Sequence, residues 1–185
     1  MSGRAVVNNV AWSMLNQLAA RGSLTLAAII VARNFDTGRF TEFSYFQLTV
    51  ATLATFCILG LGTAASKTAA EAVHDKDNGG ALGLLWVASI IFALLGAFLT
   101  LLIPDAWISG GLEIPRWLFA VGLLATALQA VPNGAVLGLE EFKRAAYVGS
   151  ATGLIVIAGA LTAIFLENVR AAIFGVILAA LFQFI

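Results

Sequence analysis

Arg21 is the residue of this chain whose type and position most strongly indicate chemistry. It is the only charged side chain deep inside any of the long apolar stretches, about ten residues before the end of the first stretch at Val31. An arginine at the centre of a membrane helix costs about 2.5–3.5 kcal/mol or more, and such residues usually face a bundle interior or a watery cavity. Its planar guanidinium suits phosphate, because it can donate two hydrogen bonds at once. The alternatives are snorkelling, a structural ion pair, or a break in the helix near Gly22.

Polar residues accompany Arg21 along the first apolar stretch. At about 100° per residue, they fall within an arc of about 140° on one helix face. The members of this stripe are Asn9, Ser13, Asn16, Gln17 and Arg21. The stripe predicts a solvated cavity on that side, while interhelical hydrogen bonding is the alternative for each Asn, Gln or Ser taken singly.

Two other apolar stretches also carry polar residues on one face. These polar residues are Tyr45, Thr49 and Thr52 in the second stretch, and Thr126, Gln129 and Asn133 in the fourth. Pro132 removes a backbone N–H from the fourth stretch, which predicts a kink or local break that aims Gln129 and Asn133 at the cavity. For the threonines, hydrogen bonds to their own helix are the alternative. The candidate substrate-binding residues are therefore Arg21, Gln17, Asn16, Ser13, Tyr45, Thr49, Gln129 and Asn133.

The sequence contains no pattern for a metal or a nucleotide. No cluster of His, Cys or carboxylate residues has metal-ligand spacing, and no Gly-x-x-x-x-Gly-Lys motif is present to cradle a phosphate. Asp75-x-Asp77 resembles the opening of a calcium loop, but Gly79 occupies its fifth position and no Glu follows at the twelfth. The formal net charge of zero argues against nucleic acid as a partner. We therefore expect a transporter without a cofactor, and not an enzyme.

Membrane helices must position these residues. Of the 185 residues, 61% are hydrophobic and 11% are charged, against about 45–50% and about 25% in soluble domains. Lipid must therefore be the solvent for most side chains. A span needs about 17–25 mostly apolar residues, and six segments meet or nearly meet this length, at 6–31, 43–62, 81–103, 117–139, 145–166 and 169–185. We predict an all-α membrane protein, a single bundle of about six transmembrane helices.

The connections between these segments are short and hold nearly all of the charges. Even the connector at 66–80 is too short for a folded extramembrane domain, and consecutive helices should be antiparallel neighbours. Gly134-x-x-x-Gly138 and Gly149-x-x-x-Gly153 are patterns of small residues that let helices approach closely. We therefore expect the fourth and fifth helices to pack tightly against their neighbours.

The distribution of basic residues gives a weak prediction of orientation. With a cytoplasmic N-terminus, the inside would carry five Lys or Arg residues and the outside four. This small excess of positive charge inside favours a cytoplasmic N-terminus. The chain is still apolar at Ile185, so we expect it to be the N-terminal part of a longer protein.

Three parts of the sequence resemble the bacterial polysaccharide flippases, which export O-antigen and related lipid-linked oligosaccharides. Residues 8–12, 28–33 and 43–46 are similar to the opening of that family, with an Ala-Arg pair at 32–33 before an aromatic-rich second helix. Residues 59–67 resemble its Gly-Leu-Gly end of helix two, and residues 134–144 its fourth-to-fifth loop. The sequence departs from the family where Asn34-Phe35 replaces the usual Leu-Gly. Members of the superfamily have two lobes, and this chain would supply the first.

The resemblance implies a function for Arg21. In related lipid II flippases, an arginine twelve residues before the Ala-Arg arginine lines the central cavity, and Arg21 precedes Arg33 by twelve. Arg21 would then attract the phosphate or pyrophosphate of a polyprenyl-linked oligosaccharide, moved across the bacterial cytoplasmic membrane by alternating access. An ion gradient or the membrane potential would drive transport, and glycan polymerase or chain-length machinery would be partners. A second cavity arginine of those relatives has no counterpart at 24–27.

Three other functions compete with this interpretation. An ion-coupled multidrug exporter of the same superfamily would be expected to carry an acidic residue deep in a span, and none of the ten acidic residues lies there. A membrane-embedded polysaccharide polymerase or ligase would typically carry a large extramembrane loop, and the connectors are too short for one. A purely structural membrane subunit would leave Arg21 unexplained.

Overall fold

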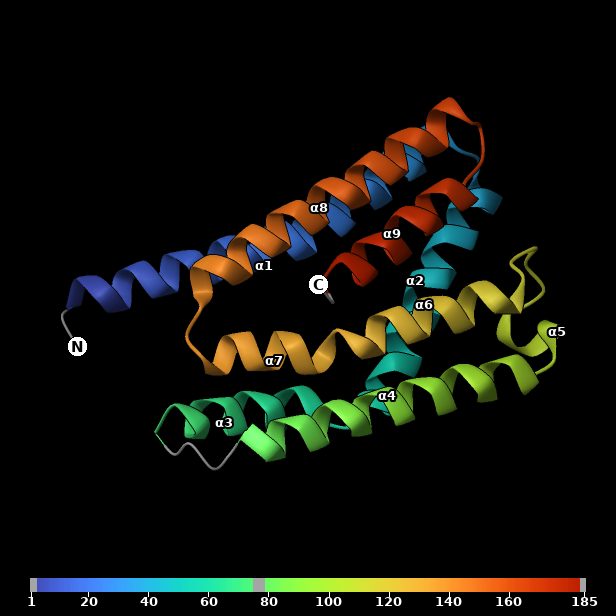
Figure 1. Cartoon of the computed structure of the whole chain (residues 1–185). Helices are drawn as coiled ribbons and strands as arrows, with labels where there is room; N and C mark the ends of the chain where they lie inside the picture. Colours follow the sequence, from blue (N-terminus) through green and yellow to red (C-terminus); the bar gives the residue numbers. More distant parts are fainter. Residues whose placement is uncertain (1–2, 75–78, 184–185) are drawn as a thin grey trace.

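The computed structural model of the chain describes residues 3–74 and 79–183, and these residues form helices and short connections without a β-strand (Figure 1). The helices are α1 (Gly3–Asn34), α2 (Thr37–Ile58), α3 (Leu61–His74), α4 (Gly79–Leu102), α5 (Asp105–Ile108), α6 (Arg116–Leu128), α7 (Ala130–Gly138), α8 (Phe142–Phe165) and α9 (Arg170–Phe182). The predicted all-α class is confirmed for the described residues. The Asp75-x-Asp77 motif lies outside them.

Several helices are long and apolar enough to cross a membrane. Four such spans lie within the described residues, at Val7–Asn34, Gly80–Leu102, Arg116–Gly138 and Phe142–Phe165, and α2 with α3 would make a fifth if the bent pair is one span. The chain is thus a multi-pass membrane protein. Helix α9 has 13 residues, or about 20 Å at 1.5 Å per residue, against a hydrocarbon core of about 30 Å. The count of six spans therefore stays a prediction.

Helix α3 replaces most of the connector that we predicted at 66–80. Leu59 (φ 41°) and Gly60 (φ 81°) adopt left-handed backbone conformations after α2, and the chain bends by 52° between α2 and α3. Beyond the bend, Ala65 and Ala69 lie four residues apart and are buried. Since alanine is the best helix former, this stretch continues as a helix with a small-residue face instead of ending as a loop.

The helices form two groups joined by α2 (Figure 1). In one group α1 and α8 run side by side and in parallel, with α9 antiparallel to α8; in the other, α3 and α7 pack together, as do α4 and α6. Helix α1 therefore has its most extensive contact with α8, which is distant in the sequence, and not with the consecutive helix α2. Helix α2 crosses between the groups and contacts α1, α4, α6 and α9.

Glycine contacts hold each group together, as the sequence predicts. A Cβ on Gly149 would clash with the Asn16 side chain across the α1–α8 interface. On the other side of the molecule, a Cβ on Gly134 would clash with the backbone carbonyl of Gly62 in α3. Gly153 and Gly138 make similar close approaches one turn later. The predicted tight packing is confirmed for both pairs.

One end of the molecule is closed by an aromatic core. Phe43, Phe46, Phe119 and Ile173 are fully buried there, and the rings of Phe46 and Phe119 have centroids 5.4 Å apart. We call this region the closed end; it includes the α1–α2, α4–α6 and α8–α9 connections. The opposite end holds the start of α1, the end of α3 and the α7–α8 turn (Figure 1), and a pocket that is lined by Glu141 of this turn reaches it. We call that region the open end.

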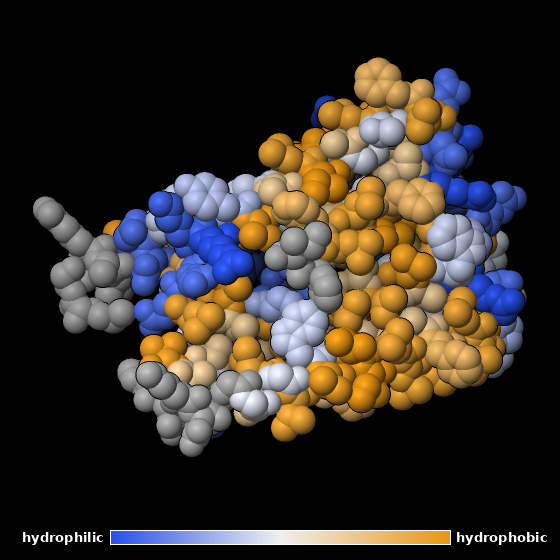
Figure 2. Space-filling model, viewed as in Figure 1, coloured by the Kyte–Doolittle hydropathy of each residue, from blue (hydrophilic) through white to orange (hydrophobic). Residues whose placement is uncertain are grey.

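The surface between the two ends is largely apolar. Figure 2 shows apolar side chains spread over the middle of the visible face, with hydrophilic ones gathered toward the ends. Helix α4 exposes large apolar side chains along its length, among them Leu84, Ile91, Leu94 and Phe98. Such a continuous exposed apolar surface suits contact with lipid and not with water.

Candidate functional site

Two pockets lie between the two helix groups and share Arg21. The inner pocket, of about 540 Å³, lies toward the closed end between α1, α2, α6, α8 and α9. The outer pocket, of about 370 Å³, lies toward the open end between α1, α7 and α8. Ala20, Arg21 and Gln183 line both pockets. The residue that the sequence singles out thus stands where the two pockets meet.

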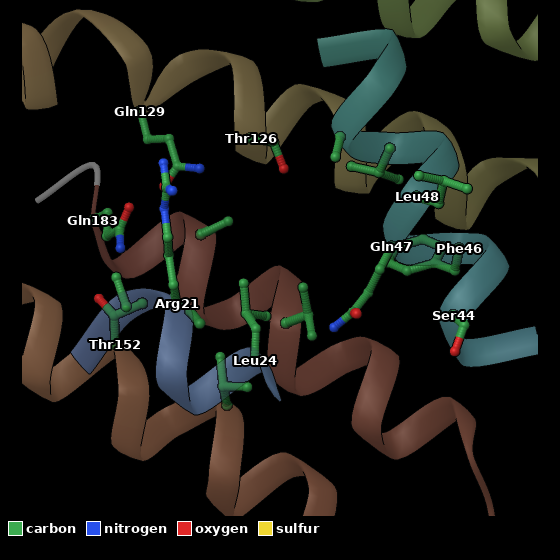
Figure 3. Close-up of a pocket in the computed structure, with 17 residues that line it drawn as sticks. Arg21, Leu24, Ser44, Phe46, Gln47, Leu48, Thr126, Gln129, Thr152 and Gln183 are labelled. Carbon is green, nitrogen blue, oxygen red and sulfur yellow. The ribbon is translucent and has the colours of Figure 1, made fainter. Parts of the chain in front are cut away.

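The Arg21 guanidinium has no hydrogen bond or ion pair with any described residue. Its side chain leaves α1 and extends across the inner pocket toward Gln129 (Figure 3). Other arginines of the described chain do form ion pairs, such as Arg144 with Glu141 at 3.3 Å. Because a guanidinium at membrane depth is unfavourable without water or an anion, Arg21 is suited to receive an anionic group from outside the chain.

Two glutamines of the inner pocket are also incompletely satisfied. The Nε2 atom of Gln47 and the Oε1 atom of Gln129 are buried and have no hydrogen-bond partner among the described residues. Both residues line the inner pocket, Gln47 from α2 and Gln129 from the junction of α6 and α7. Most buried polar side-chain atoms in proteins have a partner. The inner pocket therefore presents one cation, one spare donor and one spare acceptor.

The break between α6 and α7 places two amide side chains in the two pockets. Helix α6 ends at Leu128 and α7 begins at Ala130, so the predicted local break is present three residues before Pro132. Proline has no N–H for the Leu128 carbonyl, and its ring clashes with that carbonyl. Gln129 lines the inner pocket. Asn133 lines the outer pocket, and its Nδ2 donates to Gln183 Oε1 at 3.2 Å.

The outer pocket is the more polar of the two and carries charge at its outer edge. Its polar lining includes Asn16, Gln17 and Asn133, and the ion-paired Glu141 and Arg144. The Glu141–Arg144 pair is partly exposed at the start of α8. A hydrated, hydrogen-bonding group would find partners on both walls of this pocket.

The structure brings together five of the eight predicted binding residues. Arg21 and Gln129 line the inner pocket, and Arg21, Asn16, Gln17 and Asn133 line the outer one. Ser13, Tyr45 and Thr49 line neither pocket. Tyr45 instead packs against Phe119 with ring centroids 6.3 Å apart, so its ring belongs to the core of the closed end.

Six polar residues of the pockets were not predicted. They are Ser44, Gln47, Thr152 and Gln183 of the inner pocket and Glu141 and Arg144 of the outer one. Ser44, Gln47 and Ala51 recur at i, i+3 and i+7 and all three line the inner pocket, but this spacing alone does not favour their face over that of Tyr45 and Thr49. Gln183 is the one polar residue in 171–185, and that exception was the available signal.

The pockets combine charge, hydrogen-bonding groups and apolar walls. Among the residues that the structure describes, no group of three His, Cys, Asp or Glu side chains is placed to hold a metal ion. What the pockets offer is a guanidinium beside amides, with apolar walls provided by residues such as Leu24, Val156 and Val176. Comparison with protein-family models, with curated proteins and with solved structures gives no match.

Proposed function

We propose that this chain is the first lobe of a flippase for polyprenyl-linked oligosaccharides, with the phosphate or pyrophosphate of the lipid bound by Arg21. The single observation that carries the proposal is the Arg21 guanidinium, which lies at the junction of two pockets and has no partner among the described residues. A phosphate satisfies it, because the planar guanidinium donates two hydrogen bonds to one anionic group. The motif resemblance to polysaccharide flippases is a separate, sequence-based support.

The two pockets match an amphiphilic substrate better than a simple ion. Asn16, Gln17 and Asn133 offer hydrogen bonds to a hydrated glycan in the outer pocket. With a cytoplasmic N-terminus, the outer pocket opens on the cytoplasmic side and the closed end faces outward. This would be the inward-open state of an alternating-access cycle, from which a glycan assembled on the cytoplasmic face could bind.

The charges of the pockets weigh against an exporter of organic cations. Within the described residues, Glu141 is the one acidic side chain that lines either pocket. It is already paired with Arg144 at 3.3 Å. A cation carrier would present an unpaired carboxylate to its substrate, and here the unpaired charge is positive.

Substitution of Arg21 tests the proposal. Arg21→Ala should weaken the binding of undecaprenyl phosphate to the protein in phosphatidylcholine nanodiscs by about 10–150-fold, which corresponds to the loss of about 1.5–3 kcal/mol from hydrogen bonds to a charged group. Arg21→Lys should give an intermediate affinity, because it keeps the charge and loses the two-pronged geometry. Export of the surface glycan by cells whose own gene copy carries Arg21→Ala should fall to background.

Arg33→Ala is the matched control. Arg33 lies in the last turn of the same helix, lines neither pocket and is exposed, so this variant removes the same charge without touching the site. It should bind undecaprenyl phosphate as the unmodified protein does. Unchanged binding and export by Arg21→Ala would show that Arg21 is structural or incidental, and the proposed headgroup site would be wrong.

A further inference from the structure

A phosphate alone would not provide hydrogen-bond partners for the two amide atoms of the inner pocket that lack them within the described chain. A fully ionised phosphate on Arg21 has no hydrogen to donate to Gln129 Oε1, and Gln47 extends from α2 on the other side of the pocket (Figure 3). Neither amide atom bonds to another helix within the described chain. By contrast, the hydroxyl of Thr152 in the same pocket bonds to the Val148 carbonyl at 2.8 Å. The two glutamines thus contribute buried polar atoms that the fold does not use.

A ligand for these atoms must both accept and donate hydrogen bonds within reach of an arginine. Sugar hydroxyls do both, and an acetamido group offers one acceptor and one donor. A bare polyprenyl phosphate offers neither group beyond its phosphate. The inner pocket, at about 540 Å³, also falls within the range of about 300–1,000 Å³ that is usual for small-molecule sites.

We infer that the inner pocket binds the sugar that is directly attached to the phosphate, so that the ligand recognised is a glycosyl phosphate. The phosphate lies on Arg21, Gln47 Nε2 donates to a sugar oxygen, and Gln129 Oε1 accepts from a sugar hydroxyl or acetamido N–H. This inference rests on the proposed function and adds the part of the substrate that the inner pocket reads. Gln47 and Gln129 then determine whether a sugar-bearing lipid is preferred over the same lipid without sugar.

The experiment compares three probes on the whole protein in phosphatidylcholine nanodiscs. The probes are undecaprenyl phosphate, undecaprenyl-phosphate-linked N-acetylglucosamine, and soluble N-acetylglucosamine-1-phosphate. The unmodified protein should bind the sugar-bearing lipid about tenfold more tightly than the bare lipid phosphate, as expected for one or two hydrogen bonds. Equal affinity for the soluble sugar phosphate and the sugar-bearing lipid would identify a water-soluble source of the same glycosyl phosphate, and weaker affinity would identify the lipid.

Gln47→Met and Gln129→Met should each remove most of the tenfold preference, because they weaken the binding of the sugar-bearing lipid more than that of the bare lipid phosphate. Methionine keeps the approximate length of the side chain and removes the unpaired polar atom, so both variants should melt at the same temperature as the unmodified protein or higher. Thr55→Val is the matched control on α2. Thr55 lines neither pocket, and its hydroxyl bonds to the Ala51 carbonyl of its own helix, so the preference should persist.

The outcomes separate the inference from the proposed function. A preference that survives both methionine variants would overturn the inference, and so would a variant that unfolds, because the amide would then be structural. Equal losses of affinity for the two lipids in these variants would also overturn the inference. Arg21→Ala tests the proposed function independently, because it should weaken the binding of both lipids whether or not the sugar lies in the inner pocket.

Discussion

The arginines of the closed end differ from Arg21 at the pockets in whether the chain satisfies them. At the closed end, Arg39 Nη1 donates to the Glu167 carbonyl at 2.6 Å, and Arg170 Nη2 donates to the Glu113 carbonyl at 3.1 Å. These bonds join connections that are far apart in the sequence. Arg21 lies between the same helix groups and forms no such bond with any described residue. Arginines that hydrogen-bond within the fold can therefore be distinguished from an arginine that remains free to bind a ligand.

The contrast extends from charges to packing. Phenylalanine rings fill the closed end, and the Phe119 side chain is wholly inaccessible. At the pockets, two buried amide atoms have no partner among the described residues. We expect the packing of the closed end to contribute more to stability than the pockets do, because buried polar atoms without partners cost free energy.

The largest expected effect comes from removing an aromatic ring from the core of the closed end. Phe119→Ala should lower the free energy of unfolding by about 3–5 kcal/mol, because it leaves a cavity where the ring contacts Phe46 and Tyr45. Phe56→Ala is the control, since the Phe56 side chain is 68% exposed and its loss should cost less than about 0.5 kcal/mol. Unfolding by SDS titration in mixed micelles measures both. Similar losses for the two variants would contradict an aromatic core at this end.

A smaller effect is expected from adding one methyl group. A Cβ on Gly159 in α8 would lie 2.6 Å from the Gly175 Cα in α9, so Gly159→Ala must force two backbones apart and should cost about 1–3 kcal/mol. Gly22→Ala, next to Arg21, meets nothing within 4 Å. It should be neutral or stabilise the helix by up to about 1 kcal/mol. The same SDS titration should therefore give opposite signs, and a costly Gly22→Ala would mean that the helices are packed more closely there than in the structure.

The sequence predicts the long apolar helices well because length and composition alone determine whether a helix can cross a membrane. It misplaces the helix after residue 60 for a physical reason. Lys67 and Glu71 resemble loop charges, yet they lie one helical turn apart on an exposed face, with 3.8 Å between Nζ and Oε1. Ala65 and Ala69 form the opposite, buried face. Small apolar residues give too weak a periodic signal to distinguish such a helix from a charged connector.

The candidate site was predictable where a polar residue interrupts an apolar stretch. Arg21 and Gln129 are such residues, and both line the inner pocket. The second stretch carries two polar faces, one with Tyr45 and Thr49 and one with Gln47. Periodicity cannot choose between them, because the choice depends on how α2 packs against α6. The contact of Tyr45 with the core sends the Gln47 face to the pocket.

The smallest expected effect sharpens the comparison between the two kinds of arginine. Arg39→Met removes the bond to the Glu167 carbonyl and an ion pair with Asp36 at 3.8 Å. Both groups of that ion pair are at least half exposed, so the loss of stability should be about 0.5–1 kcal/mol. Binding of undecaprenyl phosphate should not change, because Arg39 lines neither pocket.

Arg21→Met should give the reverse pattern in the same two measurements. It removes a charge that no described residue satisfies, so stability in SDS titration should be equal or higher, while affinity for undecaprenyl phosphate should fall. Methionine replaces a long side chain in both variants, which matches the loss of packing. A loss of stability in Arg21→Met as large as that in Arg39→Met would mean that Arg21 also supports the fold. The distinction between used and available arginines would then fail, and the pocket would have to be assigned from the amides alone.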